Sequence, residues 1–365
     1  MNIVKDVCTV MEGFAPISYQ ESYDNCGLLI GNNNSPIKGV LICLDVTEEI
    51  IEEAINLNCN MVVAHHPLIF SGLKKITGNN YVERTVIKAI QNNIAVYAAH
   101  TNADNLMNGV NSKIADKIGL INRSILSPKK NTIKRLVTYC PVANAHEIQN
   151  ALFNSGAGKI GNYEECSFTV EGEGTFKANS SAKPYVGQAN MQHKEKESRI
   201  EVVFESYNET KVLEALISSH PYEEVAYDII PLENYNNYIG AGLIGYLEHE
   251  EDEISFLNRL KATFNSKSIR YSPLLNKKIK KVALCGGAGS FLLNDALKKG
   301  ADMLITSDIK YHSFFDTEKR LVLADIGHYE SEQYTMELFY ELISKNFTTF
   351  AVHLTKINTN PINYI

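Results

Sequence analysis

The chain has 365 residues and a formal net charge of −7, from 35 Lys and Arg against 42 Asp and Glu, and this acidic balance argues against nucleic acid as a partner. The length favours two or three domains over a single core. The N-terminus has no apolar signal core and no apolar stretch could cross a bilayer, so no membrane association is expected. Seven cysteines without a CxxC pair argue against a disulfide framework and favour the reducing cytoplasm.

The first third of the chain alternates between expected strands and helices. Thr47 is expected to cap a helix, because acidic residues follow it in the first turn. The apolar run 61–64 then stops at His65-His66-Pro67, where proline cannot donate to a strand ladder. The expected elements are a helix over 3–13, a strand over 39–44, a helix from 48 to about 57, a strand over 61–64, a helix over 81–92 and a strand over 94–99. This βαβ pattern predicts a parallel sheet with right-handed crossovers.

The last third of the chain repeats this arrangement. The expected elements are a strand over 281–285, a glycine turn over 286–290, a helix over 291–299, a strand over 301–306 and a strand over 321–325. As in the first third, polar residues stand where each apolar strand stops. We interpret the two parts as related α/β halves whose strand ends face one cleft. The alternative is that the two parts are not duplicated, and that polar residues simply mark strand ends as they do in α/β folds generally.

The residues between the two halves differ from them in composition and in the expected order of strands and helices. The expected elements are strands over 135–140, 166–170, 199–204 and 225–230, helices over 143–155 and 209–219, and a long polar loop over 172–197. The order βαββαβ predicts a ferredoxin-like domain inserted between the two halves. The expected fold class is therefore α/β, with an N-terminal half over 1–129, the insert over 130–234 and a C-terminal half over 235–365.

Histidines and carboxylates at the strand ends predict a metal site. His65, His66 and Asp104 follow adjacent strands of the first half. His328 and Glu332 lie at i and i+4, so they share one helix face. Imidazole and carboxylate ligands suit zinc, manganese, iron or nickel. Asp104 or Glu332 could bridge two cations about 3.5–4 Å apart, although any one of these residues alone is more often structural.

Several segments together resemble the metal motifs of the GTP cyclohydrolase 1 type 2 family, the NGG-interacting-factor-3-like proteins. They are His65–Pro67, His100–Asp104 and Gly327–Glu332, with Tyr23–Leu28 similar to the N-terminal signature, and the segments Gly286–Ser290 and Lys310–His312. Tyr23 stands where the signature usually has Trp. The resemblance covers essentially the whole chain, including an insert similar to the signal-transducer-like domain of longer members.

The resemblance implies two divalent metal ions per chain, held by His65, His66, Asp104, His328 and Glu332, with Glu330 as the competing assignment. It also implies a homohexameric ring whose metal clefts face an inner cavity. The leading hypothesis is a metal-dependent hydrolase acting on a nucleotide or another small phosphorylated substrate. Glu332, His312 or His100 could transfer protons. The alternative is a non-enzymatic protein, either a metal carrier or a regulatory ring that senses a small-molecule effector through the insert.

Three further motifs have simpler explanations. The segment Gly240–Gly245 matches G-x-G-x-x-G but precedes an apolar run instead of a helix, so a glycine-rich strand is expected in place of a dinucleotide site. The turn Gly286–Ser290 could cradle a phosphate, but tight-turn packing is favoured. His312 and Asp308 are candidates for contacts to substrate or to a metal ligand, with strand-end polarity as the alternative.

Overall fold

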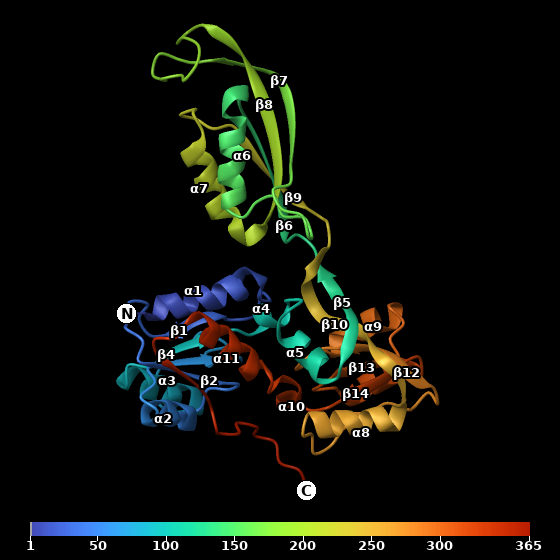
Figure 1. Cartoon of the computed structure of the whole chain (residues 1–365). Coiled ribbons are helices and arrows are strands. Elements are labelled where there is room, and N and C mark those ends of the chain that lie inside the picture. The colour runs from blue at the N-terminus through green and yellow to red at the C-terminus, as the bar shows by residue number, and fades with distance from the viewer. Residues whose placement is uncertain (1) are drawn as a thin grey trace. The chain divides into compact units, whose positions relative to one another are not determined.

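The computed structural model describes residues 2–365, and its contacts divide the chain into two compact units, each of which is described by itself (Figure 1). One unit contains Met1–Pro128 together with Asn237–Ile365, and the other contains Lys129–Asn236. Among the described residues, no helix is long and apolar enough to span a membrane.

The first sheet of the larger unit has the strand order β1-β4-β3-β2-β15. Its strands are β1 (Gly27–Ile30), β4 (Ala95–Ala98), β3 (Met61–Ala64), β2 (Gly39–Cys43) and β15 (Ala351–Leu354). All neighbours pair in parallel except the edge strand β1, which is antiparallel to β4. Every residue of β2, β3 and β4 is buried. Such strands need helices on both faces of the sheet.

Four helices cover the two faces of this sheet. Residues of α1 (Val4–Phe14) and α11 (Thr335–Asn346) pack with one set of alternating strand side chains, which includes Ile42 and Val63. Residues of α2 (Glu48–Asn56) and α3 (Tyr81–Gln91) pack with the opposite set, which includes Leu41 and Val62. The sheet therefore has a core on each face, and its strand ends are fixed from both sides.

The second sheet of the larger unit has the order β11-β14-β13-β12-β10-β5. Its strands are β11 (Arg270–Tyr271), β14 (Val322–Asp325), β13 (Met303–Thr306), β12 (Lys278–Leu284), β10 (Asn236–Asp252) and β5 (Leu120–Lys129). The helices α8 (Glu253–Thr263) and α9 (Leu293–Lys298) contribute to the cores on its two faces, and α5 (Val110–Lys117) also packs beside β12. Strands β12, β13 and β14 are parallel, and β11 is antiparallel to β14. In the first sheet, β2, β3 and β4 are likewise parallel, and β1 is antiparallel to β4. The two sheets therefore share the topology predicted for related halves, and the α/β fold class is confirmed.

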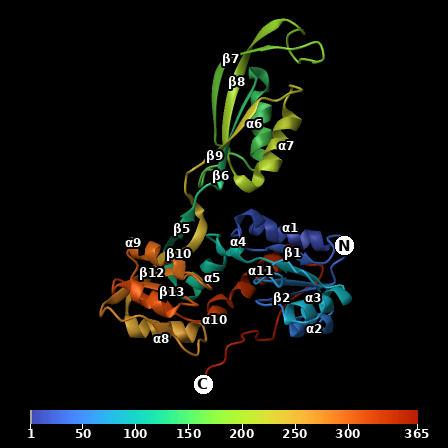
Figure 2. The ribbon, with the colours of Figure 1, turned by 180° about the vertical axis from the view of Figure 1, so that it is seen from behind.

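One strand from each half of the larger unit's sequence joins the sheet of the other half, and Figure 2 shows β5 beside β10. β5 comes before the insert in the chain but joins the second sheet, whereas β15 near the C-terminus joins the first sheet beside β2. The sequence division into 1–129 and 235–365 therefore does not coincide with the two sheets. The exchange was not expected, because the local sequence of neither segment indicates which strand it pairs with.

The smaller unit is a four-stranded antiparallel sheet of order β7-β8-β6-β9 with two helices. Its elements are β6 (Ile133–Pro141), α6 (Ala145–Asn154), β7 (Ser167–Lys177), β8 (Gln192–Glu205), α7 (Glu209–Ser219) and β9 (Tyr227–Leu232), in the βαββαβ order read from the sequence. The long loop expected over 172–197 is wrong in extent, because β7 and β8 pair as far as Lys177 and Gln192. This outer hairpin is largely exposed, so its strands have a polar composition that resembles a loop.

The cap predicted at Thr47 gives a direct test of the helix that joins β2 to β3. The Thr47 hydroxyl accepts a hydrogen bond from the Ile50 amide at 3.4 Å. Thr47→Ala should lower the free energy of unfolding by about 1 kcal/mol, because one amide of the first turn loses its partner. Thr47→Ser keeps the hydroxyl and should unfold like the wild type in urea. Equal loss in both variants would show that the cap is not the stabilising contact.

Candidate metal centre

The predicted ligands lie where strands of the two sheets end. His65 and His66 directly follow β3, and α4 (Thr101–Asp104) follows β4 and ends in Asp104. From the other sheet, β14 leads through Gly327 into α10 (His328–Glu332). The carboxyl ends of parallel strands are the usual ligand-binding edge of an α/β sheet. The structure brings together all five residues that the resemblance implies.

The five side chains form two groups that share Glu332. In one group, the His65 Nε2 atom lies 3.7 Å from Asp104 Oδ1 and 3.7 Å from Glu332 Oε1. In the other group, Glu332 Oε2 lies 2.9 Å from His66 Nε2 and 3.0 Å from His328 Nε2, and these two nitrogens are 3.4 Å apart. Each oxygen of one buried carboxylate therefore faces its own imidazole set.

Two buried atoms of the first group are left without a binding partner in the part of the protein that the structure describes. Within the described residues 2–365, His65 Nε2 and Asp104 Oδ1 are buried and have no hydrogen-bond partner. A buried polar atom without a partner is destabilising, and here a nitrogen lone pair and a carboxylate oxygen point into the same space. Zinc, manganese, iron and nickel accept this donor set. The residues present therefore fit a divalent metal ion.

The opposite nitrogen of each predicted imidazole ligand is held by a hydrogen bond. His65 Nδ1 donates to the Ala99 carbonyl at 2.9 Å. His66 Nδ1 donates to Asp45 Oδ1 at 2.7 Å, and His328 Nδ1 donates to Asp308 Oδ2 at 2.6 Å. Such bonds fix the tautomer and leave the Nε2 lone pair available to a metal. The arrangement is the one that a metal-ligating histidine requires.

The carboxylates give the site a strongly negative electrostatic potential. Burial by itself lowers the pKa of His66, but hydrogen bonds to Asp45 and Glu332 outweigh burial and raise this pKa to about 10. In the same way, Glu332 and Asp308 overcome burial and raise the pKa of His328 to about 9. Burial would raise the pKa of Glu332, but hydrogen bonds from His328 and His66, together with the nearby His65, hold it well below its usual range. A site that attracts protons this strongly also favours cations.

The glycine turn after β12 makes room for the shared carboxylate. Gly287 has φ of +60°, and a Cβ added there would lie 2.3 Å from Glu332 Oε1. The amides of Gly286, Gly287 and Gly289 donate to Asn111, Ser331 and Thr306 respectively. These three amides are already used within the protein, which is consistent with the tight-turn packing favoured from the sequence.

The other candidates take different places. Glu330 is buried and accepts a hydrogen bond from Asn360 Nδ2 at 3.1 Å, away from the imidazole nitrogens. His312 is exposed in the 3₁₀ turn Tyr311–Thr317, where its ring contacts Tyr311 and Phe315. Its role in proton transfer stays a prediction. The segment Gly240–Gly245 lies within strand β10, as expected.

Sequence reasoning missed three residues of the site. Asp45 holds His66 and accepts a 2.6 Å hydrogen bond from Thr359 of the C-terminal segment. Asp24 holds His100 Nδ1 at 2.9 Å. The signal that was available for Asp45 is its position just after β2, at the same sheet edge as His65. Asp24 lies in the segment that resembles the family's N-terminal signature. Nothing local marks Thr359.

Comparison with known proteins places this geometry in a family. The model of Duf34/NIF3 (NGG1p interacting factor 3) matches residues 2–361. The chain belongs to the DUF34/NIF3 family. It is similar to the GTP cyclohydrolase 1 type 2 homologs of Halalkalibacterium halodurans (36% identity over 364 residues, 98% of each chain) and Bacillus subtilis (36% over 366 residues, 99% of this chain and 98% of that one). This DUF34/NIF3 chain also resembles the crystal structure of a Bacillus cereus protein related to NIF3, with a TM-score of 0.86, 36% identity, and coverage of 100% of this chain and 99% of the other.

Substitution of Gly287 tests the fit of the shared carboxylate. Gly287→Ala should displace Glu332 and reduce the metal bound per chain, because the new methyl group overlaps the carboxylate. Gly300→Ala is the matched control, since Gly300 has a similar φ of +67° but no atom within 4 Å of an added Cβ. Both variants should lose about 1–2 kcal/mol of stability from the left-handed backbone. Elemental analysis after dialysis should show metal loss in Gly287→Ala alone, and equal metal in both would contradict this role.

Removal of the Asp45 charge tests the support of His66. Asp45→Asn should weaken metal binding by about 10–100-fold, the usual effect of losing a carboxylate behind a ligating imidazole. Asp116→Asn changes the net charge equally at a carboxylate that pairs with Arg123 on the surface. Competition titration with a metal-chelating dye would measure both affinities. Unchanged affinity in Asp45→Asn would show that His66 does not depend on this contact.

Proposed function

We propose that the chain binds two divalent cations side by side and acts as a metal-dependent hydrolase. The observation that carries the proposal is the position of Glu332, whose oxygens face two separate imidazole groups. His65 and Asp104 would hold one cation, His66 and His328 the other, and Glu332 would bridge them. This set uses His65 Nε2 and Asp104 Oδ1, two of the buried polar atoms that have no hydrogen-bond partner among the described residues. Zinc, manganese, iron and nickel are the candidates.

The proposed substrate is a nucleotide or another small phosphorylated molecule. Support comes from the relatives at 36% identity that are named GTP cyclohydrolase 1 type 2 homologs. A pair of divalent cations, when bound, supplies Lewis acidity and makes water a nucleophile near neutral pH. Glu332 was also a candidate for proton transfer, but both of its oxygens face imidazole nitrogens. We therefore assign Glu332 to holding the cations.

His100 is the proposed proton-transfer residue. Its ring centroid lies 5.2 Å from that of His65 and 5.4 Å from that of His66, and its side chain is 17% exposed. Asp24 accepts from His100 Nδ1 and also from the Thr101 amide and hydroxyl. Burial would raise the pKa of Asp24, but the hydrogen bonds from His100 and Thr101 keep it well below its usual range. An ionised Asp24 would hold the imidazole so that Nε2 takes or gives the proton.

We further propose a cytoplasmic homohexameric ring, with the metal clefts facing its cavity. The proposal rests on the family resemblance. It is supported by two exposed aromatic side chains of the larger unit, Tyr311 and Phe315, which are 72% and 65% exposed in a single chain and whose ring centroids lie 5.4 Å apart. Large exposed apolar groups that lie together are typical of an association surface. Light scattering of the purified protein would measure the mass of the assembly.

Metal counting tests the dinuclear site. After reconstitution, mass spectrometry of the elements should find two ions per chain in the wild type. His65→Ala and His328→Ala should each retain about one ion, because each removes a ligand from a different group, and Glu332→Gln should weaken both. Fewer than one ion per reconstituted wild-type chain would exclude the site. A single ion, lost equally in both histidine variants, would exclude the shared carboxylate as a bridge.

Turnover tests the hydrolase assignment separately. The loaded protein should hydrolyse at least one member of a panel of nucleotides and phosphorylated metabolites, and a chelator should abolish the reaction. His100→Gln should keep its metal and lose about 10²–10⁴-fold in kcat, the range for removing a general acid or base. No turnover across the panel would leave the metal site in place and favour a metal-carrier or regulatory protein that senses an effector through the smaller unit.

A further inference from the structure

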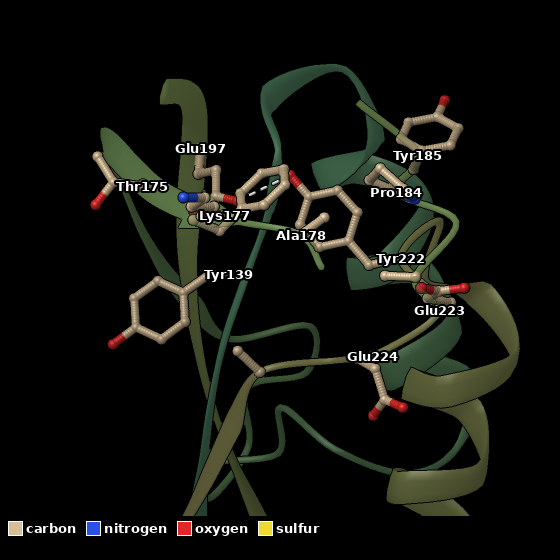
Figure 3. A pocket seen from close by; sticks show the side chains of 14 residues that line it. Tyr139, Thr175, Lys177, Ala178, Pro184, Tyr185, Glu197, Tyr222, Glu223 and Glu224 are labelled. Atoms are coloured by element: carbon tan, nitrogen blue, oxygen red, sulfur yellow. Dashed lines mark hydrogen bonds between the residues drawn. The ribbon is translucent and has the colours of Figure 1, made fainter. Parts of the chain in front are cut away.

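The smaller unit contains a cavity of about 390 Å³ that the metal chemistry does not use (Figure 3). Its volume falls in the range of small-molecule sites. The wall is built from strands β6, β7 and β8, from the loop between β7 and β8, and from the segment that precedes β9. All of these elements belong to the smaller unit, so the cavity is complete within Lys129–Asn236.

Aromatic rings surround the cavity. Tyr222 lies at the centre of the group, with ring centroids 6.4 Å from Phe176 and 6.3 Å from Tyr185. Tyr139 lines the opposite wall (Figure 3). Tyr185 is 57% exposed, so its ring is accessible to a ligand. Ring faces of this kind attract cations through their negative quadrupole.

A carboxylate is fixed beside these rings. The Tyr222 hydroxyl donates to Glu197 Oε1 at 2.8 Å (Figure 3). Gly174 makes room for the same side chain, because a Cβ added there would lie 2.0 Å from Glu197 Oε2. Burial, together with the hydrogen bond to Glu197 and its charge, raises the pKa of Tyr222, so the phenol stays a donor at neutral pH. Glu197 is thus held in place at the cavity wall.

The charges that line the cavity are mostly negative. Glu197, Glu223 and Glu224 are opposed by Lys177 alone among the lining residues. Glu223 is fixed over the loop, since its Oε1 accepts from the Lys183 amide at 2.8 Å. An anionic ligand such as a nucleotide would meet three carboxylates there. Net negative charge with aromatic faces instead favours a cation that carries apolar surface.

We propose that this cavity binds a small organic cation, an ammonium or guanidinium group on a short apolar stem. Glu197 pairs with the charge, and Tyr222, Phe176 and Tyr185 surround the apolar part. The ligand would be recognised by chemistry that differs from the metal centre, which selects bare divalent ions through nitrogen lone pairs. The proposal does not depend on hydrolase activity or on metal at the other site.

Calorimetry on the full-length, metal-loaded protein tests the proposal. The probes are choline, agmatine and spermidine, with 3,3-dimethylbutan-1-ol as the uncharged isostere of choline. At least one cation should bind, and choline should bind more tightly than its isostere. Glu197→Gln should weaken cation binding by about tenfold or more, because a hydrogen-bonded charge pair is lost. Glu171→Gln is the matched control, since Glu171 is an exposed carboxylate on β7 that does not line the cavity.

A second variant separates the rings from the carboxylate. Phe176→Leu removes a ring that makes no hydrogen bond to Glu197 and should also weaken cation binding, while urea unfolding and bound metal report whether the protein is intact. Equal affinity for choline and the isostere, or tighter binding of GMP than of any cation, would overturn the proposal. Absence of binding by all three cations at millimolar concentration would overturn it as well. Preference for an arginine-containing peptide over every free cation would overturn the assignment to a small molecule.

Discussion

The larger unit depends on one buried carboxylate. The side chain of Glu332 is only 3% exposed, and an isolated ion there would be strongly disfavoured. Its oxygens are within 3.0 Å of His66 and His328, and His65 lies at 3.7 Å. Without metal, protonated imidazoles compensate for the negative charge. With metal, cations would take the place of those protons, so the same geometry suits both states.

This constraint explains the backbone around Glu332. Gly327 has φ of +96° where β14 turns into α10, and the helical spacing of α10 places His328 and Glu332 on one face. Gly287, from the neighbouring strand end, leaves the space that Glu332 Oε1 fills. Asp308 takes φ of +52°, a conformation that aspartate tolerates, and its carboxylate accepts from His328. Gly287 therefore makes room for Glu332, Asp308 supports His328, and Gly327 starts the helix that carries both side chains.

The sequence predicted which side chains gather at the strand ends but not the residues that support them. His65, His66 and Asp104 could be found because each stands just past an apolar strand, and His328 with Glu332 because helical spacing places them on one face. Asp45 stands just past β2, so the predicted βαβ unit already placed it at the same sheet edge as His66, 21 residues away, but this signal was not used. Thr359 is 314 residues from its partner Asp45. The exchange of β5 and β15 was unpredictable for the same reason, since strand pairing is decided by long-range packing instead of local pattern.

Both units place carboxylates beside imidazole or aromatic rings, but the two sites suit different kinds of cation. At the metal centre, the imidazole Nε2 lone pairs and the Glu332 oxygens converge on one small space, which fits ions that accept electron pairs directly. In the cavity of the smaller unit, phenol and phenyl rings offer faces and no lone pair of comparable basicity, so a transition metal would gain little there. A larger, weakly hydrated organic cation gains from the faces, from Glu197 and from burial of its stem. Ring type and orientation, more than net charge, therefore determine which cation each unit can hold.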